Sequence, residues 1–319
     1  SLEVPDMGFF KTVAGLLAVG GVSYGAHSVL GSESSDNAIT IQGVINGDTI
    51  DVAQDGETTR IRLLNIDTPE MGKECLAEEA KQYLAGLLPV GTVVTLEYDD
   101  EREDKYGRTL AGVFKEGTLV NASLAEEGFA IPMKVGDNTR FFSEVSAAAD
   151  RVRAAGKGIN SAGPECVFGD DGTYRSYHDA RSTIDAAQQF QFDDMWNDEQ
   201  FNGAHVHVSR VADAKKSISA LEKAVAEQSD FQKAAFGHKQ TELLDELDND
   251  ATEIETLLNR KITYASDARE KKHTEEESAR KAEEAAQREA EEAARRAEQE
   301  VAEAARRAEQ EAQQAAPAY

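Results

Sequence analysis

The chain has 319 residues, a formal net charge of −26 at neutral pH and an aromatic content of only 7%. Hydrophobic residues make up 40% of the sequence, which suffices for a core in one or two domains but not for one that runs through the whole chain. Every long segment is acidic, and residues 38–160 alone carry a charge of −8. This balance excludes a basic tail that clamps nucleic acid, so any contact with nucleic acid must use a few individually placed cations.

An apolar segment lies near the N-terminus. Residues 12–30 contain no Asp, Glu, Lys or Arg, and a run of this length stands between a signal-peptide core and a membrane-spanning helix. We expect residues 1–37 to be a signal peptide or a membrane anchor that ends in a polar linker, with another buried helix as the alternative. Either of the first two places the rest of the chain outside the cytoplasm, secreted or membrane-anchored at the cell envelope.

Residues 38–160 show the pattern of a small α+β domain. Short alternating runs predict five strands, at residues 39–45, 49–53, 58–66, 93–98 and 109–114, and the Asn46-Gly47-Asp48 turn joins the first two as a hairpin. Helical periodicity predicts helices at 75–88, 120–127 and 141–155. Five strands with interposed helices favour an OB-fold, a five-stranded Greek-key β-barrel with packed helices.

The remainder of the chain predicts an α-helical, coiled-coil-like region. Residues 161–204 are rich in Asp, Gly, Ser and Gln, and we expect an irregular linker there that contains Cys166. Two heptad runs at 205–268, with Gly237 between them, predict a helical hairpin that closes on itself or pairs with another copy or an unknown protein. Residues 269–319 are rich in Ala, Glu and Arg and predict a solvated helix or a disordered tail.

Three polar clusters within the predicted barrel carry the chemistry, and the longest of them runs from Arg62 to Glu70. The strand must end before Pro69, so Asp67 and Glu70 lie on irregular chain at the mouth of the barrel. Hard cations take oxygen ligands from carboxylates and carbonyls. Asp48 adds a third carboxylate if the first hairpin returns to this mouth. The remaining cluster, at residues 104–108, contributes further cations.

The motifs VINGDT, RLLNIDTPE and DKYGR, followed by LVNASLAEEGFA, resemble the staphylococcal nuclease (thermonuclease) family over about residues 38–160. The resemblance implies a calcium-dependent nuclease that hydrolyses phosphodiester bonds of DNA and/or RNA and leaves 3′-phosphates. It implies that Asp48 and Asp67 bind Ca²⁺ through their carboxylates and that Thr68 does so through its backbone carbonyl.

The same resemblance implies the catalytic residues. Glu70 would be the general base, and Arg62 and Arg108 would hold the scissile phosphate and offset its developing charge, because arginine suits bidentate contact with phosphate oxygens. Lys105 and Tyr106 would bind substrate beside Arg108.

Departures from the family pattern leave an alternative open. The family often has Asp at the position of Asn46, and a tyrosine that it places near Lys134 is missing. An acidic domain also predicts slow association with polyanions and strong salt sensitivity. The alternative is therefore a catalytically weak or inactive nuclease-like binding module on an envelope-attached helical scaffold.

The two cysteines are a candidate disulfide. In the fold that the resemblance implies, Cys75 comes just after the loop that carries Glu70, and Cys166 follows the last helix of the domain. A disulfide between them would fix that loop, provided that the chain is exported to an oxidising compartment. Two reduced thiols are the alternative.

Overall fold

The structure, a computed structural model, describes residues 38–169 and 172–314. The candidate signal or anchor segment at residues 12–30 lies outside the described residues. None of the described helices combines the length and the apolarity needed to cross a bilayer. The described elements all belong to the compact unit that begins at Ala38.

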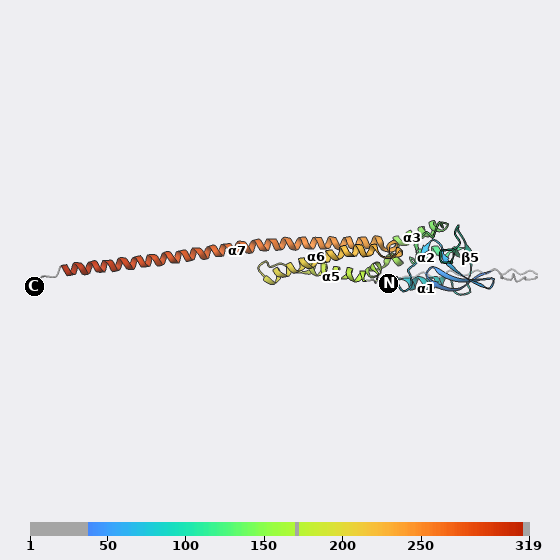
Figure 1. The fold of residues 1–319 in the computed structure, drawn as a ribbon, viewed down its shortest axis with the longest axis horizontal. Helices are drawn as coiled ribbons and strands as arrows, with labels where there is room; N and C mark the ends of the chain where they lie inside the picture. The colour runs from blue at the N-terminus through green and yellow to red at the C-terminus, as the bar shows by residue number, and fades with distance from the viewer. Residues whose placement is uncertain (1–37, 170–171, 315–319) are drawn as a thin grey trace, which may run out of the picture. The chain divides into compact units, whose positions relative to one another are not determined.

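The first part of this unit is a closed five-stranded barrel with helices, which confirms the α+β, OB-like prediction (Figure 1). Antiparallel pairs place its strands in the order β3-β2-β1-β5-β6, and a parallel pairing between β3 and β6 closes the barrel. The short strand β7 (Thr118–Leu119) extends β6 at one edge. The five barrel strands are β1 (Ile39–Asn46), β2 (Thr49–Gln54), β3 (Glu57–Leu63), β5 (Val93–Glu97) and β6 (Thr109–Lys115).

The strand expected at 58–66 ends at Leu63, and the reason lies in Asn65. This residue has a left-handed backbone (φ 58°), which a strand cannot contain. Its buried side chain donates to the Asn138 carbonyl at 2.8 Å and accepts from the Phe141 amide at 3.1 Å. The chain then continues as β4 (Ile66–Asp67), which leaves the barrel sheet and pairs with β8 (Ile131–Pro132).

Three helices cover the barrel, and its core is formed by fully buried side chains such as Ile41, Ile50 and Leu84. The helices are α1 (Ala77–Leu87), α2 (Val120–Glu126) and α3 (Phe142–Ala155). The helix expected from residue 75 begins at Ala77 because Leu76 has a left-handed backbone, with φ 66°.

The irregular linker expected at 161–204 is corrected by the structure, which places helices α4 (Pro164–Phe168) and α5 (Thr173–Gln189) there, after the 3₁₀ turn Gly158–Ser161. Tyr177, Ala180 and Ile184 form the buried stripe of α5. Their helical spacing is present in the sequence, but a stripe with few large apolar residues gives a weak signal. Tertiary packing against the following helices compensates for that weakness.

The helical hairpin is longer than expected, and its turn lies elsewhere. Helix α6 (Asp198–Ala226) begins before residue 205 because the Asn197 side chain accepts hydrogen bonds from the Glu199 and Gln200 amides. The turn occupies residues 227–229, whereas Gly237 lies inside helix α7 (Asp230–Gln314). Helices α5, α6 and α7 pack side by side around one apolar core (Figure 1). Beyond residue 269 the described part of α7 is almost entirely exposed.

Candidate active site

The structure brings Asp48, Arg62 and Asp67 into direct contact. Pairing of Thr49 with Arg62, and a 2.9 Å hydrogen bond from the Leu63 amide to the Asp48 carbonyl, bring the first hairpin turn against β3. Arg62 Nη2 then lies 2.9 Å from Asp48 Oδ2 and 3.1 Å from Asp67 Oδ1. The side chains of Arg62 and Asp48 are only 6% and 7% exposed, so this is a buried cluster.

The charges of the cluster do not balance, because one guanidinium faces two carboxylates. Burial raises the pKa of Asp67 to about 6; Arg62 acts against this rise, and the charges of Asp48 and Glu74 add to it. Since folding favours the protonated form of a carboxyl whose pKa is raised, keeping Asp67 ionised at neutral pH costs stability. A further cation at the cluster would return that stability.

The oxygen atoms around the cluster suit such a cation. Thr68 is 6% exposed, and within the described part of the chain its Oγ1 has no hydrogen-bond partner. A Cβ added at Gly47 would lie 2.8 Å from that oxygen, so only glycine lets the hairpin turn approach Thr68 this closely. Carboxylate and hydroxyl oxygens are donors that a hard cation accepts. Among residues 38–169 and 172–314 no group of three or more His, Cys, Asp or Glu side chains could hold a metal, so backbone and water oxygens would have to complete the ligand set.

Asn46 has a structural task in the same turn. Its side-chain oxygen accepts a 3.1 Å hydrogen bond from the Asp48 amide. Asn46, at the position where the family often has Asp, therefore orients the backbone of Asp48, a predicted metal ligand. The side-chain amide oxygen of Asn accepts this hydrogen bond as well as an Asp carboxylate would.

Glu70 lies outside the buried cluster, on the loop between β4 and α1. Its carboxylate is 62% exposed and pairs with Lys73 at 2.9 Å. Its backbone amide donates to Glu74 Oε2 at 2.8 Å. Sequence reasoning missed Glu74 as a residue that shapes this loop. The signal for Glu74 in the sequence is its position four residues after Glu70, the spacing of one helical turn. In the structure the chain makes such a turn here, with the Glu74 amide 3.0 Å from the Glu70 carbonyl.

Arg108 is also separate from the buried cluster, on the tight turn that begins at Asp104. Asp104 accepts hydrogen bonds from the Tyr106 and Arg108 amides, both at 2.9 Å, and from Arg108 Nε at 2.6 Å. Burial alone would raise the pKa of Asp104, but these hydrogen bonds and the Arg108 charge hold it below its ordinary value. Tyr106 is 73% exposed and lies beneath the cationic groups of Lys105 and Arg108, 5.0 and 5.6 Å from its ring centroid. The turn therefore presents an aromatic ring and two cations to solvent.

In the structure a disulfide joins Cys75 to Cys166, with 5.5 Å between their Cα atoms and a sequence separation of 91. It links the end of the Glu70 loop to helix α4. Among the described residues no cysteine is free.

Opening this disulfide is expected to cost about 2–5 kcal/mol of the free energy of unfolding, since a long closed loop restricts the unfolded chain. Urea unfolding of the oxidised chain should be compared with that of the reduced chain and of the Cys75→Ser/Cys166→Ser double variant. The reduced chain and the variant should unfold at the same, lower urea concentration. Equal midpoints for oxidised and reduced protein, or a mass that shows two free thiols before reduction, would contradict the prediction.

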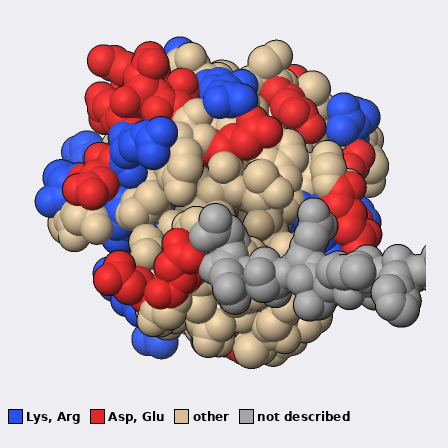
Figure 2. Space-filling view, turned by 90° about the vertical axis from the view of Figure 1, so that its right-hand side faces the viewer, with Lys and Arg blue, Asp and Glu red and all other residues tan. Residues whose placement is uncertain are grey.

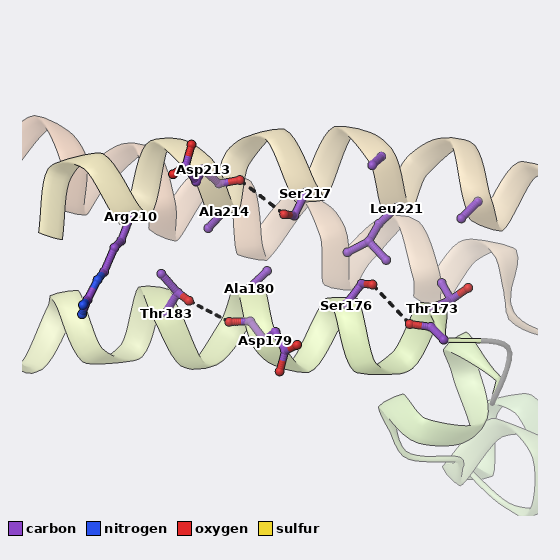
Figure 3. A pocket seen from close by; sticks show the side chains of 13 residues that line it. Thr173, Ser176, Asp179, Ala180, Thr183, Arg210, Asp213, Ala214, Ser217 and Leu221 are labelled. Carbon is purple, nitrogen blue, oxygen red and sulfur yellow. Dashed lines mark hydrogen bonds between the residues drawn. The ribbon is translucent and has the colours of Figure 1, made fainter. Parts of the chain in front are cut away.

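Acidic and basic side chains are intermixed on the face shown in Figure 2, without one continuous basic patch. A groove of about 780 Å³ between α5 and α6 is lined by small and polar residues and by none of the predicted site residues (Figure 3). The hydroxyls of Ser176, Thr183 and Ser217 in this groove each donate to the carbonyl four residues earlier in their own helix. The hydrogen atoms of these hydroxyls are therefore already used in hydrogen bonds to the backbone. The groove contains none of the predicted catalytic or metal-binding residues.

The chain is similar to known nucleases. The family model described as staphylococcal nuclease homologue matches residues 60–161. A thermonuclease of Staphylococcus hyicus is 32% identical over 133 residues, which cover 40% of this chain and 78% of that protein. A thermonuclease of Staphylococcus intermedius is 39% identical over 99 residues, 28% of this chain and 56% of the relative. Endonuclease YncB of Bacillus subtilis is 36% identical over 113 residues, which cover 33% and 53% of the two chains.

These similarities concern the barrel. The chain spans only about half the length of two of these three relatives. Helices α5, α6 and α7 follow the matched residues.

Proposed function

We propose that this chain, which belongs to the staphylococcal nuclease homologue family, is a calcium-dependent nuclease that hydrolyses phosphodiester bonds of DNA or RNA. Its barrel is a nuclease-like domain. The observation that carries the proposal is the cluster of Asp48, Arg62 and Asp67, where two carboxylates contact a single guanidinium. The next residue, Thr68, has a buried hydroxyl without a hydrogen-bond partner among the described residues. Burying a carboxylate without a full counter-charge costs stability, and a bound cation would offset that cost.

Each residue of the site has a role in the proposed reaction. Asp48, Asp67 and the Thr68 carbonyl hold Ca²⁺, which as a bound cation supplies charge stabilisation at the phosphoryl oxygens. Glu70 accepts the proton of the attacking water. Arg62 and Arg108 bind the phosphate oxygens and offset the charge that develops in the transition state.

The turn at residues 104–108 binds the substrate in this proposal. Tyr106 is exposed enough for a base to stack on it, and Lys105 and Arg108 lie close enough to contact the adjoining phosphates. By analogy with the family pattern, the products carry 3′-phosphates.

We also propose that the protein acts outside the cytoplasm. The disulfide between Cys75 and Cys166 supports this location, because disulfides persist in oxidising compartments.

Chelating calcium is expected to abolish cleavage. Purified protein should be incubated at low salt with end-labelled single-stranded DNA in calcium, in excess EDTA, and in EDTA followed by excess calcium. Cleavage should appear in the first and third samples, with 3′-phosphates on the products. Binding of DNA without cleavage in calcium would refute the nuclease and favour the binding-module alternative; equal cleavage in EDTA would refute the metal requirement.

A further inference from the structure

The loop that carries Glu70 is closed by Glu74. The backbone carbonyl of Glu70 accepts hydrogen bonds from the amides of Lys73 and Glu74, at 3.1 and 3.0 Å. The backbone amide of Glu70 donates to the side-chain oxygen Oε2 of Glu74 at 2.8 Å. One carboxylate oxygen of Glu74 therefore fixes the backbone of the predicted general base. The other carboxylate oxygen of Glu74 connects the loop to another part of the protein.

That second oxygen is bound by the helical region. Ser229, in the turn between α6 and α7, donates to Glu74 Oε1 at 2.6 Å across 155 residues of sequence. The neighbouring Cys75 is joined to Cys166 of α4 by the disulfide. Two adjacent residues at the end of the Glu70 loop are thus held by the helical region, one through a charge-assisted hydrogen bond and one through a covalent bond.

The helical side of this junction is itself well fixed. Gln232 and Gln240 are 6% and 2% exposed, and both donate to the Val167 carbonyl, at 2.8 and 2.7 Å. Gln232 donates to the Cys166 carbonyl as well, at 3.0 Å. Because these buried amides tie α4 to α7, Cys166 and Ser229 form one rigid support for the loop.

The junction also has an open hollow. Its volume is about 410 Å³, and the residues that line it come from both sides, namely Glu70, Lys73, Glu74, Gly169, Gln228, Ser229 and Gln232. The Glu70 side chain therefore lies beside the helical region and stays open to solvent. If the contact between the helical region and the loop changed, we expect the Glu70 carboxylate to change position and to remain accessible to substrate.

We propose that Ser229 and Glu74 are positioning residues for Glu70, and that the turn between α6 and α7 is a working part of the nuclease site. This inference rests on the function proposed above. Neither residue needs to touch substrate, since the two Glu74 oxygens are occupied by the Glu70 amide and the Ser229 hydroxyl. Losing either of these two hydrogen bonds displaces Glu70, and a displacement of about 1 Å lowers the rate by up to about 100-fold. We expect kcat to fall and KM to stay unchanged.

Substitutions at Ser229 separate positioning from stability. Ser229 Oγ accepts from the Gln232 amide at 3.0 Å and so caps α7 as well as donating to Glu74. Ser229→Thr keeps both bonds, whereas Ser229→Asp keeps the cap and removes the donor. Ser217→Ala is the control, because the Ser217 hydroxyl donates to the Asp213 carbonyl of its own helix.

The test is the nuclease assay with single-stranded DNA and calcium. Ser229→Asp and Glu74→Gln should each lower kcat by between about 10-fold and 100-fold with an unchanged KM. The double variant should be no slower than the slower single variant, because the two residues act in one chain of contacts. Ser229→Thr and Ser217→Ala should match the wild type.

Hydrogen exchange at the Glu70 amide gives a second readout that needs no substrate. Exchange should quicken in Ser229→Asp and stay as in the wild type in Ser229→Thr. An unchanged exchange rate in Ser229→Asp, or a kcat equal to that of Ser229→Thr, would overturn the positioning role while the wild type still cleaves DNA. A wild type that does not cleave DNA at all refutes the proposed function itself, and with it the catalytic purpose of the junction.

Discussion

Replacing Glu70 by Gln is expected to lower the rate of DNA cleavage by about 10²–10⁴-fold, the range that a positioned general base contributes. The change removes a proton acceptor and keeps the shape of the side chain. Because the carboxylate is 62% exposed and its ion pair is with the exposed Lys73, the fold should be unaffected. The loss therefore measures chemistry rather than stability.

A matched control exists for this substitution. Glu126 is similarly exposed, at 59%, and pairs with Arg151 at 3.2 Å on another part of the barrel domain. Glu126→Gln should leave kcat unchanged. If the cleavage rate of Glu70→Gln lay within about threefold of that of Glu126→Gln, the loss would be far smaller than a general base contributes. Glu70 would then have no part in the mechanism.

Arg108→Ala belongs to the same test and should also lower cleavage by orders of magnitude, since the loss of one preorganised charge contact typically costs about 10²–10³-fold in kcat. Its control is Arg151→Ala, the other partner of the control ion pair. If Arg108→Ala retained the activity of Arg151→Ala, Arg108 would be only the partner of Asp104.

The second large effect is expected on stability. Arg62→Met should lower the free energy of unfolding by about 3–5 kcal/mol in calcium-free buffer, because it leaves the buried carboxylate of Asp48 and the partly buried carboxylate of Asp67 without a counter-charge. Urea unfolding measures the loss. Arg60→Met is the control, since Arg60 lies on the same strand and pairs with Asp51 at 2.8 Å while being 52% exposed. An exposed pair of this kind contributes at most about 1 kcal/mol.

Calcium extends this measurement to the metal site without recourse to activity. A cation that binds the two carboxylates in the folded state should stabilise both the wild type and Arg62→Met, by about 2.7 kcal/mol at a free concentration 100 times its dissociation constant. Asp48→Asn should remove most of that gain. Equal losses for Arg62→Met and Arg60→Met, together with no effect of calcium, would show that the cluster is an ordinary ion pair.

The barrel could be predicted because its signals are local. Alternating strands and the Asn46-Gly47 turn specify a hairpin over a few residues, and the structure contains all five predicted strands, of which only the third is clearly shorter than the pattern indicates. The sequence pattern predicts the helical turn at Gly237, whereas the turn between α6 and α7 lies at residues 227–229. A glycine within a helix costs only about 1 kcal/mol, which packing repays. The better signal was Ser229 with Gln232 three residues later, the spacing of a capping box.

The predicted site was accessible from sequence only in part. Arg62 lies on β3, and the pairing of β3 with β2 brings it beside Asp48 in the turn that precedes β2. Asp67 lies on β4, beyond the left-handed Asn65, and the pairing of β4 with β8 belongs to a second sheet. Glu74 gained its place through a contact with Ser229, and no local pattern reports a partner 155 residues away. The roles of Glu70 and Arg108 stay predictions, since each lies in an ion pair of its own.

The distance in sequence between Glu74 and Ser229 also sets an order of events during synthesis. The family match ends at residue 161, so the ribosome completes the barrel well before it reaches Ser229. At about 5–20 residues per second, the 68 residues from 161 to 229 (229 − 161) take about 3–14 s to synthesise. During that interval a nascent chain has its strands and then Cys166, but not the Ser229 contact. The order of translation therefore delays completion of the site in the cell that makes the protein.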